Sequence, residues 1–287
     1  MFQILTKEAL NPLIVRMEVE APRIAASALP GQFLIVRTHA LGERIPLTIC
    51  DYSPERGTVT LVTQIVGASS RRICDMEVGE CFTDVVGPLG QPSEFVIEPL
   101  ETLREQRFLF VAGGLGTAPV YPQVKYLHER GVKVDVVLGA KSKDYVIFEQ
   151  EMQAVCDRLF ICTDDGSYGY PGLVTGKVQE LLAAGEHYDQ AVAIGPMVMM
   201  KYVALTTQPF GLPLVVSLNT LMVDGTGMCG ACRVTIAGKT KFACVDGPEF
   251  NAYDVDFDEA IQRQGMYKTQ EVEADHQCRL EHGTKTR

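Results

Sequence analysis

The hydrophobic pattern of this chain changes once, near residue 98, and this change limits the possible folds more than any other feature. Between residues 2 and 96, short runs such as TVTLVTQIV (58–66) alternate apolar and polar residues, and turn pairs such as Pro30-Gly31 separate them. Short strands at this spacing predict a small antiparallel barrel. After a polar stretch, continuous apolar runs such as RFLFVAGG (107–114) alternate with helical segments. That alternation predicts a parallel sheet covered on both faces.

A third unit is expected after about residue 214. It contains three closely spaced cysteines, two short strand candidates (RVTIAG and TKFAC) and an acidic tail with a helical candidate, VDFDEAIQRQ. The fold class is therefore multidomain β plus α/β, and a chain of 287 residues has room for several compact units. We predict the bounds 1–97 for the barrel, 98–214 for the parallel α/β unit and 215–287 for the remainder.

Composition excludes several classes of protein. The formal charge is −10, whereas proteins that bind nucleic acids usually carry a basic surface. The most apolar run, AVAIGPMVMM, ends at once in Lys201, and the first ten residues carry no readable secretory signal. Nine unevenly spaced cysteines do not suit an exported disulfide framework. We therefore expect a cytoplasmic protein that binds neither a membrane nor nucleic acid.

The strongest chemical signal is a loop of one aspartate and three cysteines: Asp224, Cys229, Cys232 and, eleven residues later, Cys244. This is the plant-type iron–sulfur spacing C-x4-C-x2-C with a distant fourth cysteine, except that Asp224 replaces the first cysteine. Glycines at three positions of the loop allow backbone amides to approach a compact cluster. A carboxylate is a harder donor than a thiolate but can still hold ferric iron. The loop therefore predicts an iron–sulfur site.

Two other interpretations of the loop remain open. A structural zinc site could use the same three thiolates and one carboxylate, although zinc ligands more often occur as two separate pairs. The thiols could also be unliganded residues of a buried hairpin. An Asp-Gly turn would by itself explain Asp224.

A second signal is GGLGTAP (113–119), which lies between a predicted strand and a predicted helix. Glycines let a backbone approach a ligand, and the amino terminus of a helix favours phosphate. This is not the fingerprint G-x-G-x-x-G, because Pro119 occupies the last glycine position, and a plain tight turn is the alternative. The strand ends TDDGS (163–167) and GPM (195–197) should converge on the same edge of a parallel sheet.

A third, weaker signal lies in the barrel, in ERIPLT (43–48) and GASS (67–70). Arginine can pair with a pyrophosphate, and a threonine hydroxyl can bond a ring nitrogen. An exposed strand end would also explain these residues.

Taken together, these motifs resemble a known family. PGQF, ERIPLT, VGASS, GGLGTAP, TDDGSYG, IGPM and D-x4-C-x2-C-x11-C occur here in the order typical of the ferredoxin–NADP reductase superfamily. The branch that the chain resembles includes the electron-transfer subunit of dihydroorotate dehydrogenase. Within it, the chain is most similar to the small subunits of bifurcating NADH-dependent reduced ferredoxin:NADP oxidoreductases and of sulfide dehydrogenases. The resemblance covers nearly the whole chain.

The resemblance implies a FAD-binding barrel, an NAD(H)-binding α/β unit and a carboxyl-terminal [2Fe–2S] module. It implies flavin-mediated oxidoreductase chemistry with no catalytic acid–base pair, Thr48 lying near flavin N5. The implied FAD residues are Arg44, Pro46, Leu47, Thr48, Thr63, Gln64, Gly67, Ser69 and Ser70. The implied NAD(H) residues are Gly113, Gly114, Gly116, Thr117, Asp165, Gly166, Gly195, Pro196 and Met197. The implied metal ligands are Asp224, Cys229, Cys232 and Cys244.

The chain departs from the family pattern at three positions. Ile45 stands where the dihydroorotate-type branch usually has an arginine, and Arg44 could replace it at the phosphate. Asp224 replaces the first cysteine, which favours the bifurcating or sulfide-dehydrogenase branch. Ile194 stands where many reductases have a cysteine beside the nicotinamide.

The family likeness leads to a main functional hypothesis and two alternatives. The main hypothesis is the NAD(H)-handling subunit of a bifurcating ferredoxin:NADP oxidoreductase. Its partner would be a larger flavin/[4Fe–4S] subunit in a heterodimer, through which ferredoxin is reached indirectly. The alternatives are the electron-transfer subunit of sulfide dehydrogenase or of dihydroorotate dehydrogenase, and a zinc-holding module without activity. The likeness favours NAD over NADP, but Lys141 and Lys143 could reach a 2′-phosphate, so this choice stays open.

Overall fold

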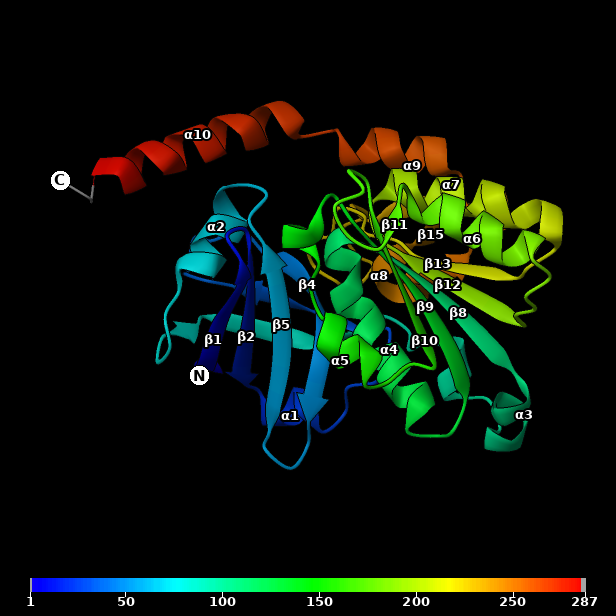
Figure 1. The fold of residues 1–287 in the computed structure, drawn as a ribbon. Coiled ribbons are helices and arrows are strands. Elements are labelled where there is room, and N and C mark those ends of the chain that lie inside the picture. Colours follow the sequence, from blue (N-terminus) through cyan, green and yellow to red (C-terminus); the bar gives the residue numbers. More distant parts are fainter. Residues whose placement is uncertain (1, 285–287) are drawn as a thin grey trace.

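The computed structural model describes residues 2–284, with side chains from Phe2 to Leu280. Two seven-stranded sheets lie side by side, and a smaller carboxyl-terminal unit packs against both (Figure 1). Each sheet arises from one of the two hydrophobic patterns of the sequence.

The first sheet is a nearly closed antiparallel barrel with strand order β6-β1-β2-β5-β4-β3-β7. Its end strands β6 and β7 follow each other directly in the chain, and the alternating residues of β3 and β5 send one row of side chains inward (Leu34, Val36, Val59, Leu61). The prediction of a barrel is confirmed. The strands are β1 (Phe2–Asn11), β2 (Ile14–Glu20), β3 (Phe33–Arg37), β4 (Ile45–Ser53), β5 (Thr58–Gln64), β6 (Cys81–Phe82) and β7 (Asp84–Leu89), with helices α1 (Pro22–Ala25) and α2 (Ala68–Asp75).

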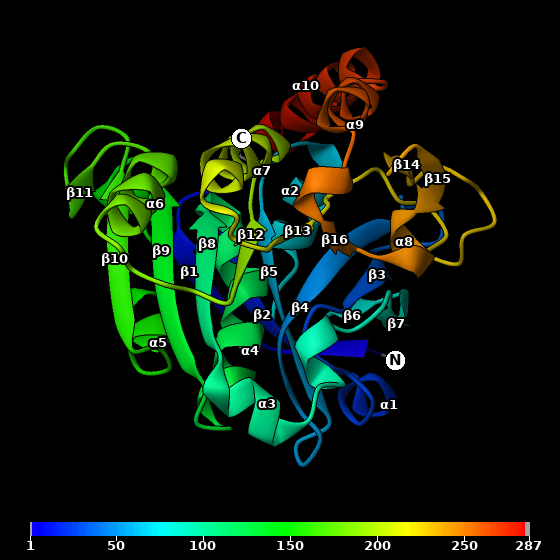
Figure 2. The ribbon, with the colours of Figure 1, turned by 90° about the vertical axis from the view of Figure 1, so that its right-hand side faces the viewer.

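The second sheet is a parallel sheet with helices on both faces and the strand order β11-β10-β9-β8-β12-β13-β16, in which only β16 runs antiparallel (Figure 2). The order reverses between β8 and β12, as in a doubly wound fold. The predicted α/β architecture is confirmed. The strands are β8 (Arg107–Gly113), β9 (Lys133–Ala140), β10 (Arg158–Thr163), β11 (Tyr170–Pro171), β12 (Gln190–Ile194) and β13 (Leu214–Ser217). The helices are α3 (Leu100–Glu105), α4 (Thr117–His128), α5 (Glu149–Gln153), α6 (Val174–Ala183) and α7 (Met197–Thr207).

The carboxyl-terminal unit adds its own strand to the second sheet, because β16 (Glu249–Asn251) pairs with β13. The cysteine loop precedes the hairpin of β14 (Arg233–Ile236) and β15 (Lys239–Phe242), and α8 (Ala243–Asp246) carries Cys244. The sheet thus runs across the predicted bound at residue 214, since β13 begins there. The three bounds themselves stay a prediction.

The chain ends in α9 (Phe257–Gln264) and the long helix α10 (Lys268–Thr284), which crosses from the second unit to α2 of the barrel (Figure 1). Arg71 of α2 and Asp275 of α10 form an ion pair of 3.2 Å there. Among residues 2–284, no helix combines the length and the apolar surface needed to cross a bilayer.

The barrel and the parallel unit are joined by an apolar interface flanked by ion pairs. Cys50 and Val62 of the barrel pack against Ala118 and Phe148 of the second unit. At the rim of this interface, Lys125 Nζ lies 2.9 Å from Asp51. These contacts hold β4 against α4, the helix that follows the glycine-rich loop.

Candidate functional site

The loops after β8 (113–117) and after β12 (195–197) pack directly against each other. A Cβ atom on Gly116 would lie 2.1 Å from the carbonyl oxygen of Ile194, a distance that no backbone contact allows. Gly114 has a φ of +55°, which favours glycine. Because β8 and β12 flank the reversal of strand order, the two loops stand where ligands of open parallel sheets bind. The structure therefore brings these two predicted NAD(H) loops together.

Replacing Gly116 by alanine should separate the two loops. The new methyl group would have to displace backbone rather than a flexible side chain, so we expect a loss of about 1–3 kcal/mol in stability. We also expect NADH affinity to fall about tenfold or more, since 1.4 kcal/mol corresponds to a factor of ten. Thermal unfolding and an NADH titration measure the two effects. Gly265→Ala is the control, because its Cβ would meet its nearest neighbour at an ordinary 3.5 Å.

The third predicted loop lies on the same edge of the sheet, two strands from β8. Oδ1 of Asp165 accepts hydrogen bonds from the amide and the hydroxyl of Ser167, at 3.0 and 2.6 Å. These bonds hold the pKa of Asp165 below its usual value, so the exposed carboxylate stays charged. Gly166 turns the chain with a φ of +69°. The amide of Lys143 also donates to Ser167, which ties the loop after β9 to this one.

The predicted flavin wall is the first half of β4. Pro46, Leu47 and Thr48 pair with β3 and are only half-buried, although β4 is an interior strand of the barrel. Leu47 packs with the barrel core, so Pro46 and Thr48, on alternate positions, face outward. An interior strand with a partly open outer face is a suitable surface for a flat ring.

The predicted phosphate end of the flavin site lies where β5 leads into α2. Thr63 is buried and Gln64 half-buried at the end of β5. The hydroxyl of Ser70 accepts from the amides of Val66 and Gly67, at 2.9 and 3.0 Å, and so closes the first turn of α2. Ser70 therefore shapes this turn, whereas a Cβ on Gly67 would meet no atom within 4 Å.

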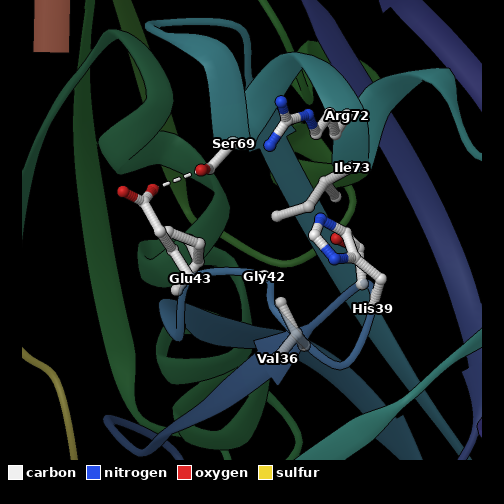
Figure 3. A pocket seen from close by; sticks show the side chains of 9 residues that line it. Val36, His39, Gly42, Glu43, Ser69, Arg72 and Ile73 are labelled. Atoms are coloured by element: carbon white, nitrogen blue, oxygen red, sulfur yellow. Dashed lines mark hydrogen bonds between the residues drawn. The ribbon is translucent and has the colours of Figure 1, made fainter. Parts of the chain in front are cut away.

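A shallow hollow opens beside this turn (Figure 3). Ser69 and Arg72 reach it from α2, and His39 and Glu43 reach it from the connection between β3 and β4. Glu43 and Ser69 are hydrogen-bonded to each other across its entrance. Neither His39 nor Arg72 is among the predicted site residues. Arg72 follows Ser69 by three residues on α2, and this helical spacing is the signal that could have pointed to it.

Arg44 is not among the residues that line this hollow. Its Nε atom donates a hydrogen bond of 2.9 Å to the carbonyl oxygen of Val223, the residue before Asp224. Arg44 thus connects the start of the flavin wall to the cysteine loop. Its contact with a phosphate stays a prediction.

The cysteine loop brings two of the four predicted ligands into contact. The Sγ atoms of Cys232 and Cys244 lie 3.2 Å apart and are buried, whereas Cys229 is exposed. The carboxylate of Asp224 accepts hydrogen bonds from the amides of Thr226 and Cys229, both at 2.9 Å. Among the residues described, no three side chains of metal-binding type are gathered around one point. The complete ligand set stays a prediction.

The donors and the backbone of this loop nevertheless suit an iron–sulfur cluster. Gly225, Gly227 and Gly230 all have φ values between +69° and +81°, so they aim successive amides in directions that other residues rarely allow. The amide of Gly227 acts on the Cys244 sulfur as a hydrogen-bond donor. Burial raises the pKa of Cys244 to about 12, so a bound cation would be needed to hold this sulfur as a thiolate.

The flavin wall and the cysteines are separated by a single strand, β3. Phe33 and Ile35 of β3 belong to the same small apolar core as Cys232 and Cys244. In the sheet register, Phe33 is opposite Thr48 and Ile35 is opposite Pro46. Directly opposed residues lie on the same face of a sheet. The predicted flavin and metal sites therefore share one outer face of the barrel.

Comparisons with known proteins agree with this arrangement. Residues 219–256 match the model of the iron-sulfur cluster binding domain of dihydroorotate dehydrogenase B. An uncharacterized protein encoded in the adh 3′ region of Clostridium beijerinckii is 51% identical over 99% of this chain and 95% of its own. The dihydroorotate dehydrogenase B (NAD(+)) electron transfer subunit homolog of Thermotoga maritima is 44% identical over 92% and 93%.

A solved structure also matches nearly the whole chain. It is a chain of the NADH-dependent reduced ferredoxin-NADP oxidoreductase, studied for flavin-based electron bifurcation, with a TM-score of 0.89 and 41% identity over 98% of both chains.

Proposed function

The chain belongs to the family of dihydroorotate dehydrogenase B-type electron transfer subunits, with a ferredoxin–NADP reductase-like fold, and on this premise we propose that it transfers electrons between NAD(H) and a partner subunit. The relevant complex would be a bifurcating NADH-dependent ferredoxin:NADP oxidoreductase. The observation that carries this proposal is β3, whose Phe33 and Ile35 join the predicted flavin wall to the cysteine core.

The residues of the chain would position the cofactors and exclude water. When bound, FAD would exchange a hydride with NAD(H) and single electrons with a [2Fe–2S] cluster. Pro46 and Thr48 would support the flavin ring, and loops 113–117 and 195–197 would hold the nicotinamide. Cys229, Cys232 and Cys244 would hold the cluster with Asp224.

The composition of the purified protein tests this proposal directly. We expect flavin absorbance together with iron and acid-labile sulfide in equal amounts. Zinc without acid-labile sulfide would support a structural module instead, and a preparation still colourless after anaerobic reconstitution would contradict both cofactor assignments.

Replacing Asp224 by cysteine tests whether Asp224 is a metal ligand or only accepts hydrogen bonds from the loop backbone. If Asp224 holds the metal, the variant should keep its cluster but change its reduction potential and electron paramagnetic resonance spectrum, because ligand type sets both. If Asp224 only accepts the amide hydrogen bonds of Thr226 and Cys229, the spectrum should stay as in the wild type. Asp224→Asn, which keeps the shape of the side chain and one of its two acceptor oxygens, is the matched control for the loop.

The partner is proposed to dock beside the cysteine loop. Val223, Met228 and Val245 expose 47%, 88% and 41% of their surface around it and form a group of exposed apolar side chains beside the cysteines. Isolation of the native complex, followed by identification of the second chain, tests this proposal. A larger flavin/[4Fe–4S] protein would support the bifurcating oxidoreductase. A dihydroorotate dehydrogenase or sulfide dehydrogenase chain would instead assign this subunit to that enzyme.

A further inference from the structure

Glu249 lies where the three units of the chain meet. Its Oε1 atom accepts hydrogen bonds from Ser93 Oγ at 3.0 Å and from Gln123 Nε2 at 2.8 Å. Ser93 lies in the segment that leaves the barrel, Gln123 lies in α4, and Glu249 begins β16 behind the cysteine loop. One carboxyl oxygen therefore connects the barrel, the parallel unit and the cysteine module.

The junction contains more hydrogen-bond acceptors than donors. Gln123 is fully buried, and its Oε1 atom has no donor. Among the described side chains, no lysine, arginine or histidine forms an ion pair with Glu249. The charged group that acts on it through space is Glu94, which is also negative and therefore disfavours ionisation of Glu249. A proton on Glu249 would neutralise a half-buried charge and add a donor at a site that lacks one.

The environment favours the neutral form of Glu249 near neutral pH. Burial raises the pKa of its carboxyl group from 4.5 to about 7, against the opposing effect of the hydrogen bonds from Ser93 and Gln123. A carboxyl group with a raised pKa does not lower the free energy of unfolding while it is protonated. It lowers this free energy once the pH rises far enough to ionise it. A small additional electrostatic effect would therefore decide whether Glu249 carries a proton.

The cysteine module is placed to provide that effect. Glu249 follows Cys244 by five residues through α8, and the next residue, Phe250, packs on the apolar core that contains Cys232 and Cys244. Negative charge added at the cysteines would act on Glu249 across this apolar core, which screens charge less than water does. Such charge favours the protonated carboxyl group.

We propose that Glu249 is a positioning residue that takes up one proton when one electron is added at the cysteine module and releases it when the electron leaves. This inference rests on the proposed function. The electron comes from the reduced flavin and the proton from water, so the net charge of the module does not change. In the reduced protein, the neutral acid keeps the three units joined.

The test is a potentiometric titration of the complete protein, with the cluster followed by electron paramagnetic resonance from about pH 6 to about pH 8. We expect the wild-type potential to fall as pH rises, with a slope of up to 59 mV per unit, the value for one proton per electron. Glu249→Gln, which cannot ionise, should remove this slope. Glu94→Gln removes one exposed negative charge nearby and should keep it.

A second variant tests the inference if Glu249→Gln does not fold. Ser93→Ala removes a hydrogen bond that lowers the pKa of Glu249, so the pH at which the wild-type potential begins to fall should move upward. The same slope in Glu249→Gln as in the wild type would overturn the inference. A cluster with a pH-independent wild-type potential would overturn the inference alone, whereas the absence of any cluster signal would overturn the proposed function as well.

Discussion

Replacing Cys244 by serine is expected to abolish electron transfer to one-electron acceptors while NADH still reduces a dye that accepts hydride from the flavin. Cys244 is 2% exposed and its Sγ atom lies 3.2 Å from that of Cys232, so its loss removes half of a buried sulfur pair. Serine places a harder oxygen donor on a shorter bond, which suits iron–sulfur chemistry poorly. We expect the iron content to fall about tenfold or more.

The measurements are iron and sulfide content, the visible spectrum, and the two reductase activities in parallel. Cys81→Ser is the matched control, because Cys81 lies in β6 of the barrel and outside the cysteine core. Unchanged iron content in Cys244→Ser would remove this residue from the ligand set. Loss of both activities together would show that the substitution disturbs the flavin site across β3.

The sequence predicted the features that depend on local pattern. Alternation at 58–66 predicted an antiparallel strand, and continuous apolar residues at 107–112 predicted a strand of a covered parallel sheet, so both sheets were predicted. The outer face of the first strand is buried as well, because Val62 packs against the second unit, and the alternation did not show this. The loops after β8, β10 and β12 were predicted as well, because the carboxyl ends of parallel strands share one edge. In each case the signal lies within a few neighbouring residues.

Contacts between distant segments could not be predicted in this way. The pairing of β13 with β16 follows from tertiary packing, since three residues of β16 have little strand signal of their own. Arg44 was predicted at a phosphate, and only the fold shows that it bonds Val223, which is 179 residues away. Phe33 and Ile35 looked like ordinary strand residues, and their contact with the cysteine core depends on where the third unit docks.

The charged network at the opposite edge of the parallel sheet was also not predicted. In the sequence, Asp135 is a single polar residue within an apolar run, and its side chain is 1% exposed. Its Oδ2 atom accepts hydrogen bonds from Arg107 Nη2 and Arg158 Nη2, both at 2.7 Å, and from the Tyr188 hydroxyl at 2.8 Å. Burial and the bond to Asp135 raise the pKa of Tyr188, which therefore remains a neutral donor. Glu186 pairs with both arginines.

Replacing Asp135 by asparagine should therefore destabilise the protein by about 1–3 kcal/mol, because the two arginines lose the buried one of their two carboxylate partners and keep only Glu186. Asparagine keeps the shape of the side chain, so the loss reports charge rather than a cavity. Denaturant unfolding measures the effect, and Asp258→Asn is the control. Asp258 pairs with Lys201 at 2.6 Å but is 83% exposed, and exposed pairs contribute about 1 kcal/mol or less. Equal losses in the two variants would show that the buried carboxylate stabilises the sheet no more than a surface ion pair does.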